Sequence, residues 1–222
     1  MASPVTAEYS AAIKLTGNVE NGKKLYRVCI VCHGPEGWGN ASGSYPQIAG
    51  QLPTVVIKQL ADFRAGNRDN PMMTPFTGKS ILPDAQAIAD ISAYIAQLPM
   101  TPHNGKGPGF DLAAGKEIYK KECAECHGKV GEGDTKDHIP LLYGQHYNYL
   151  VRQFDWIRTG QRRNADEKMV KQVQNFHPRD VHTVMDYISR LPPPKEKLAK
   201  DGWTNPDFPN FQRSSFNRHL GR

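Results

Sequence analysis

Cys29-Ile30-Val31-Cys32-His33-Gly34 and Cys123-Ala124-Glu125-Cys126-His127-Gly128 are two copies of one short pattern, Cys-x-x-Cys-His-Gly, in a chain of 222 residues. The second copy begins 94 residues after the first. All four cysteines of the chain lie in these two stretches, so none is left for a structural disulfide. This cysteine usage argues against a disulfide framework and indicates that each motif carries chemistry.

The similarity between the two halves of the chain extends well beyond these motifs. At the same offset of 94, residues 45–51 match residues 139–145, and residues 56–66 match residues 150–160. The offset is 96 where Met73 matches Met169. One nearly constant offset over so many positions indicates a duplicated domain of roughly 90 residues.

The spacing of apolar residues predicts three helices in each copy and no strand of useful length. Gly66 and Gly160 follow the second helix of each copy as C-caps, and Pro83 and Pro178 suit the first turn of the third helix. The fold class is therefore all-α. The expected helices span about 19–31, 53–65 and 83–97 in the first copy, and about 113–125, 147–159 and 178–190 in the second.

A glycine and two tyrosines recur in each copy and predict how its first and third helices cross. A glycine without a side chain lets two helices approach closely, while the aromatic rings fill the adjacent notch. The two equivalent sets are Gly22, Tyr26 and Tyr94 in the first copy, and Gly115, Tyr119 and Tyr187 in the second. We interpret these positions as structural.

Composition divides the chain into five segments. Gly105-Lys-Gly-Pro-Gly109 is rich in glycine and proline and marks a linker, and the stretch from Pro192 to Pro194 ends the second copy. The segments are an N-terminal segment 1–17, a first domain 18–104, the linker 105–109, a second domain 110–193 and an irregular C-terminal tail 194–222.

The tail interleaves aromatic residues with prolines and basic residues. It contains too many aromatic residues for a simply disordered segment. We expect it to pack as a strap across its own protein or to dock a dedicated partner. The aromatic residues are Trp203, Phe208, Phe211 and Phe216, and the basic ones include Lys200, Arg213 and Arg218.

Cys-x-x-Cys-His is the pattern that attaches a c-type haem to a protein chain. The two thiols reach the two vinyl groups of one porphyrin, and the adjacent histidine points its imidazole at the iron. The cysteine pairs lie too far apart for a zinc ribbon, and a thioredoxin-like site would need a βαβ context. We therefore predict two covalently bound haem c groups, with His33 and His127 as the proximal iron ligands and Cys29, Cys32, Cys123 and Cys126 as the attachment points.

A methionine follows each proximal histidine by about 40 residues, between the second and third helices. Met169 is the candidate distal ligand in the second copy, because Met185 falls within a helix and suits the core. Met73 is favoured over Met72 in the first copy, since a rigid proline turn follows it. Methionine and histidine together leave no open iron site, which favours electron transfer over catalysis. The rival histidines, which we expect on surfaces or helix faces, are His138, His146, His177 and His182.

Two further pairs of equivalent residues are candidates for supporting the haems. Pro46 and Pro140 each lie 13 residues after their histidine, where a backbone carbonyl can accept the other ring N–H of that histidine. Lys58 and Arg152 are positioned either to pair with haem propionates or to form a solvated basic helix face.

The net charge of +6 is concentrated at the C-terminus, because residues 194–222 carry 6 basic and 3 acidic residues. A basic surface can steer an acidic partner protein, but no basic helix is dense enough to bind nucleic acid. No run of about 18 apolar residues exists, so we expect no integral membrane segment. Residues 1–17 lack the apolar region of a signal peptide, and we expect a mature periplasmic chain from which that peptide is absent.

These features together resemble the dihaem cytochrome c4 family over residues 18–193. The resemblance implies two class I cytochrome c domains related by a pseudo-twofold axis, in a periplasmic or membrane-tethered bacterial electron carrier. It also implies that Met73 completes the haem of His33, and Met169 the haem of His127. This chain departs from the family pattern in the spacing around Pro71 and Pro75 and in its tail.

Three functions remain open at this point. The first is an electron shuttle between a donor, such as a dehydrogenase or a quinol-oxidising complex, and an acceptor, such as a terminal oxidase or a reductase. The second is a dedicated electron-transfer subunit of a periplasmic dehydrogenase, for example one that oxidises a sulfur compound. The third is a dihaem enzyme, which the lack of a fifth cysteine disfavours because no thiolate ligand is available.

Overall fold

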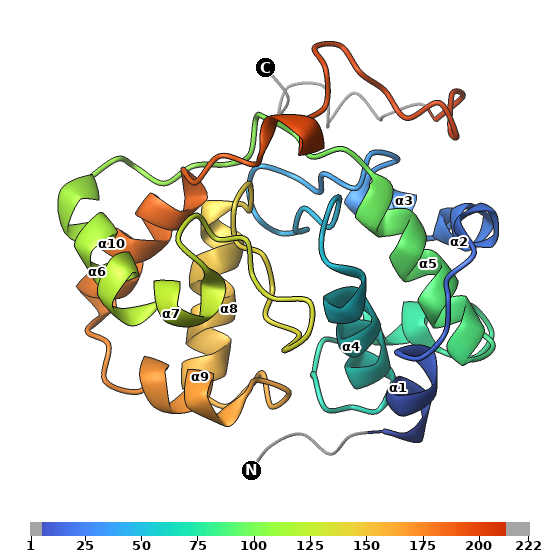
Figure 1. Ribbon diagram of the computed structural model, residues 1–222, viewed down its shortest axis with the longest axis horizontal. Helices are drawn as coiled ribbons and strands as arrows, with labels where there is room; N and C mark the ends of the chain where they lie inside the picture. The colour runs from blue at the N-terminus through green and yellow to red at the C-terminus, as the bar shows by residue number, and fades with distance from the viewer. Residues whose placement is uncertain (1–5, 212–222) are drawn as a thin grey trace.

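The structure is a computed structural model that describes residues 6–211 of the chain. Those residues form helices and loops, with two isolated β-bridges in place of any strand. Figure 1 shows two lobes side by side, one built from α1 to α5 and the other from α6 to α10. The predicted all-α fold of two tandem domains is therefore confirmed.

The first domain contains five α-helices and one short 3-10 helix. A single apolar core, which includes Tyr26, Ile88 and Ile91, lies between them. The elements are α1 (Ala7–Ala12), α2 (Val19–Tyr26), α3 (Ile30–His33), α4 (Pro53–Arg64), η1 (Thr74–Thr77) and α5 (Ala85–Gln97).

The second domain repeats this plan around its own core, which includes Tyr119, Val181 and Val184. Met100, which follows α5 near the end of the first domain, packs in this second core. The elements are α6 (Leu112–Glu122), α7 (Ala124–His127), α8 (Tyr147–Arg158), α9 (Glu167–Val173) and α10 (Pro178–Ser189), followed by η2 (Lys195–Lys197) in the tail.

The helix predicted over each Cys-x-x-Cys-His motif is in fact two helices. In the first domain the Cys29 N–H bonds the Tyr26 carbonyl three residues back at 2.9 Å, which tightens the turn and ends α2. In the second domain Cys123 has φ −124°, outside the helical region, and separates α6 from α7. The prediction of one continuous helix was wrong, because apolar spacing does not report a change of axis at the first cysteine.

The ends of the other predicted helices agree with the structure except at one proline. Gly66 and Gly160 have φ of +73° and +76°, as expected of residues that end a helix. Pro178 is the first residue of α10. Pro83, however, precedes α5, whose N-cap is Asp84, with its carboxylate accepting the Ala87 N–H at 2.8 Å. Two helices, α1 and α9, were not predicted.

Close helix crossings at Gly22 and Gly115 hold each domain together, as the repeated glycines predict. A Cβ at Gly22 would lie 2.1 Å from the Asp90 carbonyl oxygen on α5, and one at Gly115 would lie 2.5 Å from that of Thr183 on α10. The neighbouring tyrosine rings pack together, with centroids 5.3 Å apart for Tyr26–Tyr94 and 5.6 Å for Tyr119–Tyr187.

The described part of the tail, residues 194–211, lies as a strap over the first domain. It leaves the second domain, passes over the boundary and follows the outer side of the first lobe (Figure 1). Ala199 N–H bonds the Met100 carbonyl at 2.9 Å, and the ring of Trp203 packs 5.8 Å from that of Trp38. Asn205, which is 3% exposed, donates to the Pro35 carbonyl at 2.6 Å. The expected packing across a haem domain is confirmed for these residues, whereas Arg213, Phe216 and Arg218 lie outside the described residues.

Candidate haem sites

The two motif histidines are buried in the same way in the two domains. His33 is 6% exposed and His127 is 9% exposed. The Nδ1 of His33 lies 3.1 Å from the Pro46 carbonyl oxygen, and the Nδ1 of His127 lies 3.1 Å from that of Pro140. A carbonyl can only accept, so Nδ1 carries the proton in each ring.

This arrangement leaves the lone pair of Nε2 available to a metal in each ring. Burial lowers the pKa of His33 and of His127, which favours the neutral imidazole that an iron ion requires. The carbonyl partner fixes the orientation of the ring, as outer partners of metal-bound histidines do. The residues present therefore fit a haem in each domain.

A tyrosine fixes the backbone just beyond each histidine. The Tyr26 hydroxyl donates to the Gly34 carbonyl at 2.9 Å, and the Tyr119 hydroxyl donates to the Gly128 carbonyl at 2.6 Å. Both glycines have positive φ, which turns the chain sharply away from the motif. The helix crossing and the haem motif are thus coupled through the same tyrosine in each domain.

The cysteines of each motif lie between the core and the surface. Cys29 and Cys123 pack against their domain cores, and burial raises the pKa of each thiol to about 12. Cys126 is exposed and Cys32 is partly buried. Thiols that stay protonated are poor nucleophiles and poor zinc ligands.

The candidate methionines differ in how far they reach the core. Met73 immediately precedes η1 and packs against the core of the first domain, whereas Met72 is 61% exposed. Met169 lies on α9 and packs against the second core. Met185 is 6% exposed on α10 and belongs to that core, as its helical position predicts.

Lys58 and Arg152 both lie at the boundary between the domains, where protein groups contact them. Lys58 pairs with Asp62 at 2.5 Å and donates to the Asn164 carbonyl of the second domain at 3.2 Å. The Arg152 guanidinium donates to the Ser44 carbonyl at 3.2 Å and lies over the ring of Tyr149. Their pairing with propionates stays a prediction.

The rival histidines have hydrogen-bond partners away from the motifs. His138 contacts the Tyr9 hydroxyl at 2.6 Å, and His182 contacts that of Tyr147 at 2.8 Å. His177 caps α10. His146 is buried at the domain boundary, where its Nδ1 accepts the Gly105 N–H at 2.9 Å and its Nε2–H donates to the Trp38 carbonyl at 2.7 Å.

Sequence reasoning missed a polar cluster between α4 and α8 at the domain boundary. Two arginines 94 positions apart, Arg68 and Arg162, each donate to the side-chain oxygens of Gln59 and Gln153 at 2.7 to 3.2 Å. Burial and the neighbouring arginine lower the pKa of Arg162 to about 9. The signal in the sequence was a polar pair kept in both copies of the repeat.

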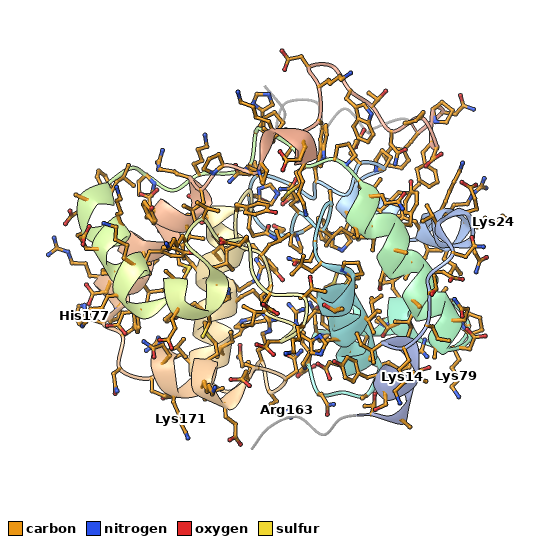
Figure 2. All side chains as sticks on the ribbon, in the orientation of Figure 1. Lys14, Lys24, Lys79, Arg163, Lys171 and His177 are labelled. Atoms are coloured by element: carbon orange, nitrogen blue, oxygen red, sulfur yellow. The ribbon has the colours of Figure 1, made fainter. Side chains whose placement is uncertain are left out.

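The basic side chains spread over both domains. Figure 2 shows Lys14, Lys24 and Lys79 at the rim of the first domain, Lys171 at the rim of the second, and Arg163 near the boundary. Within residues 6–211, no helix combines the length and apolarity needed to cross a bilayer.

Comparisons with known proteins agree with this geometry. The sequence profile of the cytochrome c family matches residues 19–99 and 112–192. Cytochrome c4 of Azotobacter vinelandii is 28% identical over 79% of this chain and 90% of its own length. The thiosulfate dehydrogenase electron acceptor of Stutzerimonas stutzeri is 27% identical over 85% of this chain and 94% of its own.

A solved structure shows the same architecture. Reduced recombinant cytochrome c4 from Pseudomonas stutzeri matches with a TM-score of 0.67 at 27% identity, over 79% of this chain and 100% of that one. The chain therefore belongs to the cytochrome c family, as an electron carrier of the cytochrome c4 type with two tandem domains and two covalently bound haem c groups.

Proposed function

We propose that each haem is held by one repeat unit of the chain, through two cysteines, one histidine and one methionine. The observation that carries this proposal is the pair of buried histidines, each with its Nδ1–H on a proline carbonyl and its Nε2 lone pair free for iron. The ligand sets are Cys29, Cys32, His33 and Met73 in the first domain, and Cys123, Cys126, His127 and Met169 in the second.

Burial supports Met73 over Met72 in the first set. A thioether must reach the buried face of the porphyrin, and Met73 packs against the core while Met72 is 61% exposed. The haem supplies one-electron chemistry, with a potential that methionine ligation raises. The protein excludes water, orients the histidine rings and fixes their protons on Nδ1.

We also propose that the protein works in the periplasm between redox partners. The donor is a dehydrogenase or a quinol-oxidising complex, and the acceptor is a terminal oxidase or a reductase. Two similar domains that would each hold one haem suit a carrier that accepts and delivers electrons at its surface.

A second candidate function is that of a dedicated acceptor for a dehydrogenase that oxidises a sulfur compound. Its support is the similarity, over 85% of this chain, to the electron acceptor of a thiosulfate dehydrogenase. A partner that docks through residues 200–211 would have to displace the strap from the first domain, since Trp203 and Asn205 are already engaged there.

Rapid mixing separates the two candidates. The oxidised protein is mixed with thiosulfate dehydrogenase and thiosulfate, and the reduced protein is mixed with a terminal oxidase, while the haem absorbance is followed. Fast oxidation by the oxidase with slow reduction by the dehydrogenase supports the general carrier. The opposite pattern supports the dedicated acceptor, and a protein that neither partner turns over would refute both assignments.

A further inference from the structure

The peptide group between Pro46 and Gln47 forms hydrogen bonds at both of its ends. Its carbonyl oxygen accepts the Nδ1–H of His33 at 3.1 Å. Its N–H, on Gln47, donates to the side-chain oxygen of Gln145 at 3.0 Å. One planar amide thus connects the proximal histidine of the first domain to a glutamine of the second.

The second domain contains the equivalent connection, with the roles of the two domains exchanged. The Pro140 carbonyl accepts the Nδ1–H of His127 at 3.1 Å, and the N–H of the same peptide group, on Leu141, donates to the side-chain oxygen of Gln51 at 3.1 Å. Gln51 belongs to the first domain. Each histidine is therefore linked to the opposite domain by a chain of two hydrogen bonds.

Both glutamines are held so that they cannot turn away. The Gln145 amide donates back to the Gln47 carbonyl at 2.8 Å, and the Gln51 amide donates back to the Leu141 carbonyl at 3.2 Å. Each glutamine oxygen also accepts the backbone N–H of its own next residue at 3.0 Å, from His146 and from Leu52 respectively. Gln51 and Gln145 are equivalent positions of the repeat, 94 residues apart.

We propose that Gln145 and Gln51 are positioning residues that act on the haem of the opposite domain, each through the single peptide group that accepts the proximal histidine. This proposal rests on the ligation of iron by His33 and His127. It assigns a redox role to two residues that are neither haem ligands nor in the same domain as the haem they affect.

The physical basis is polarisation along the chain of hydrogen bonds. An amide whose N–H donates to a strong acceptor carries more negative charge on its carbonyl oxygen, so it accepts a second hydrogen bond more strongly. A stronger bond from Nδ1–H increases the electron density and the basicity of the imidazole. A more basic ligand stabilises ferric over ferrous iron, so the glutamine lowers the reduction potential of the opposite haem.

The test is a redox titration of the haem-loaded protein in which the two haems are resolved by NMR. Each set of haem methyl resonances is assigned through its contacts with residues of its own domain. Gln145→Leu should raise the ratio of reduced to oxidised haem at fixed potential about threefold in the first domain, roughly 30 mV at about 59 mV per tenfold change. Gln51→Leu should do the same in the second domain.

Gln47→Leu is the matched control. Gln47 also bonds across the boundary, since its amide donates to the Gly144 carbonyl at 2.6 Å, and its side-chain oxygen accepts the Thr101 N–H at 2.8 Å. These side-chain hydrogen bonds go to groups other than the peptide group that holds His33. The equivalent residue of the second domain is Leu141, so the substitution copies a side chain that the repeat already accepts. It should leave both potentials unchanged.

The proposal requires each substitution to shift the potential of the haem in the opposite domain. Shifts that fall on the haem of the mutated domain, or equally on both haems, would overturn the proposal, as would a shift of the same size in Gln47→Leu. Gln51 is only partly buried, so Gln51→Leu decides the question even if Gln145→Leu fails to fold.

The unmodified protein separates this proposal from the ligation on which it rests. If the ring protons of His33 and His127 lack the large shifts of iron-bound histidines, the ligation itself is wrong. If those shifts are present and the crossed changes in potential are absent, the relay alone is wrong.

Discussion

At the scale of single residues, several methionines and histidines have the chemistry of an iron ligand, and their surroundings distinguish between them. Met72 and Met73 are adjacent and carry the same thioether, yet only Met73 packs against the core. The four rival histidines are likewise chemically competent, but each has a partner elsewhere, such as His146 at the Trp38 carbonyl. Burial and hydrogen bonding therefore support the proposed ligand set over these alternatives.

Met73→Ala should lower the reduction potential of the first haem, because it removes the proposed thioether ligand, which favours ferrous iron. The expected change is on the order of 0.1 V, within the range of roughly 0.8 V that axial ligands cover. The measurement is a redox titration, together with the weak long-wavelength absorption band of ferric haem with a sulfur ligand. Met72→Ala is the control and should change neither. The opposite result would move the ligand to Met72.

At the scale of elements, the helix crossings and the strap decide how firmly the haem motifs are held. Tyr26 and Tyr119 each connect a crossing to the glycine that follows the proximal histidine. The strap adds a further layer over the first domain through Asn205 and Asp207, which both contact the Tyr94 hydroxyl. Within residues 6–211, the two domains thus share their helix packing but differ in how the tail contacts them.

Gly22→Ala should destabilise the first domain by roughly 2 to 3 kcal/mol, because the new Cβ would collide with backbone rather than with a flexible side chain. The contact at 2.1 Å from the Asp90 carbonyl oxygen forces α2 and α5 apart. Lys24→Ala, on the exposed side of α2, should change stability by less than about 0.5 kcal/mol. Denaturant unfolding of the haem-loaded protein measures both, and equal stabilities would show that the crossing is not tight.

Asn205→Ala should loosen the strap. The buried amide holds the Pro35 carbonyl and the Tyr94 hydroxyl, and leaving a buried carbonyl unpaired costs about 1–3 kcal/mol. Limited proteolysis should then cleave the tail faster, whereas the exposed neighbour Thr204→Ala should leave the rate unchanged. Equal cleavage of both variants and the parent would mean that Asn205 does not anchor the strap.

At the scale of the whole molecule, the boundary between the domains is crossed by many hydrogen bonds between polar side chains and backbone groups. It contains Gln51 and Gln145, the arginine pair Arg68 and Arg162, and His146. The two glutamines and the two arginines are equivalent positions of the repeat. A polar, geometrically specific interface fixes the domains in one arrangement. The same interface connects His33 and His127 to the opposite domain through hydrogen bonds.

His146 makes this interface sensitive to acid. Burial lowers the pKa of His146, and protonation of its Nδ1 would turn an acceptor of the Gly105 N–H into a donor. The unfolded chain, with an ordinary pKa of about 6.5, binds the proton first as pH falls. The contribution of His146 to stability is therefore complete above pH ~6.5 and is lost as pH falls from there through the lowered pKa of the folded state.

The loss should amount to about 1.4 kcal/mol for each unit by which folding lowers the pKa. The measurement is the free energy of unfolding between pH ~5 and pH ~8, compared with His146→Gln. The other histidines are common to both proteins and cancel in the difference. A curve that His146→Gln does not flatten below pH ~6.5 would rule out this origin of the acid sensitivity.

Much of the fold was predictable because the motif is a local pattern and because each predicted helix, cap and crossing residue occurs in both copies of the repeat. The cores of the second and third helices of each domain, the C-cap glycines and the close crossings all follow from periodicity and residue type. The break at the first cysteine of each motif, the start of α5 after Pro83, and helices α1 and α9 did not. Those features depend on competition between backbone conformations of similar energy, which tertiary packing decides.

The sequence by itself determined that the chain is a duplicated domain with two haem-attachment motifs, because thiol and imidazole spacing within one turn is a local property. Only the tertiary structure decided that the tail packs over the first domain. It also decided that Gln51 and Gln145 bond the peptide group that accepts the motif histidine of the other domain. Such contacts join residues some 90 or more positions apart, as between Gln51 and Leu141, and no pattern along the chain encodes which buried N–H meets which side-chain oxygen. Their formation depends on the packing of both domains at once.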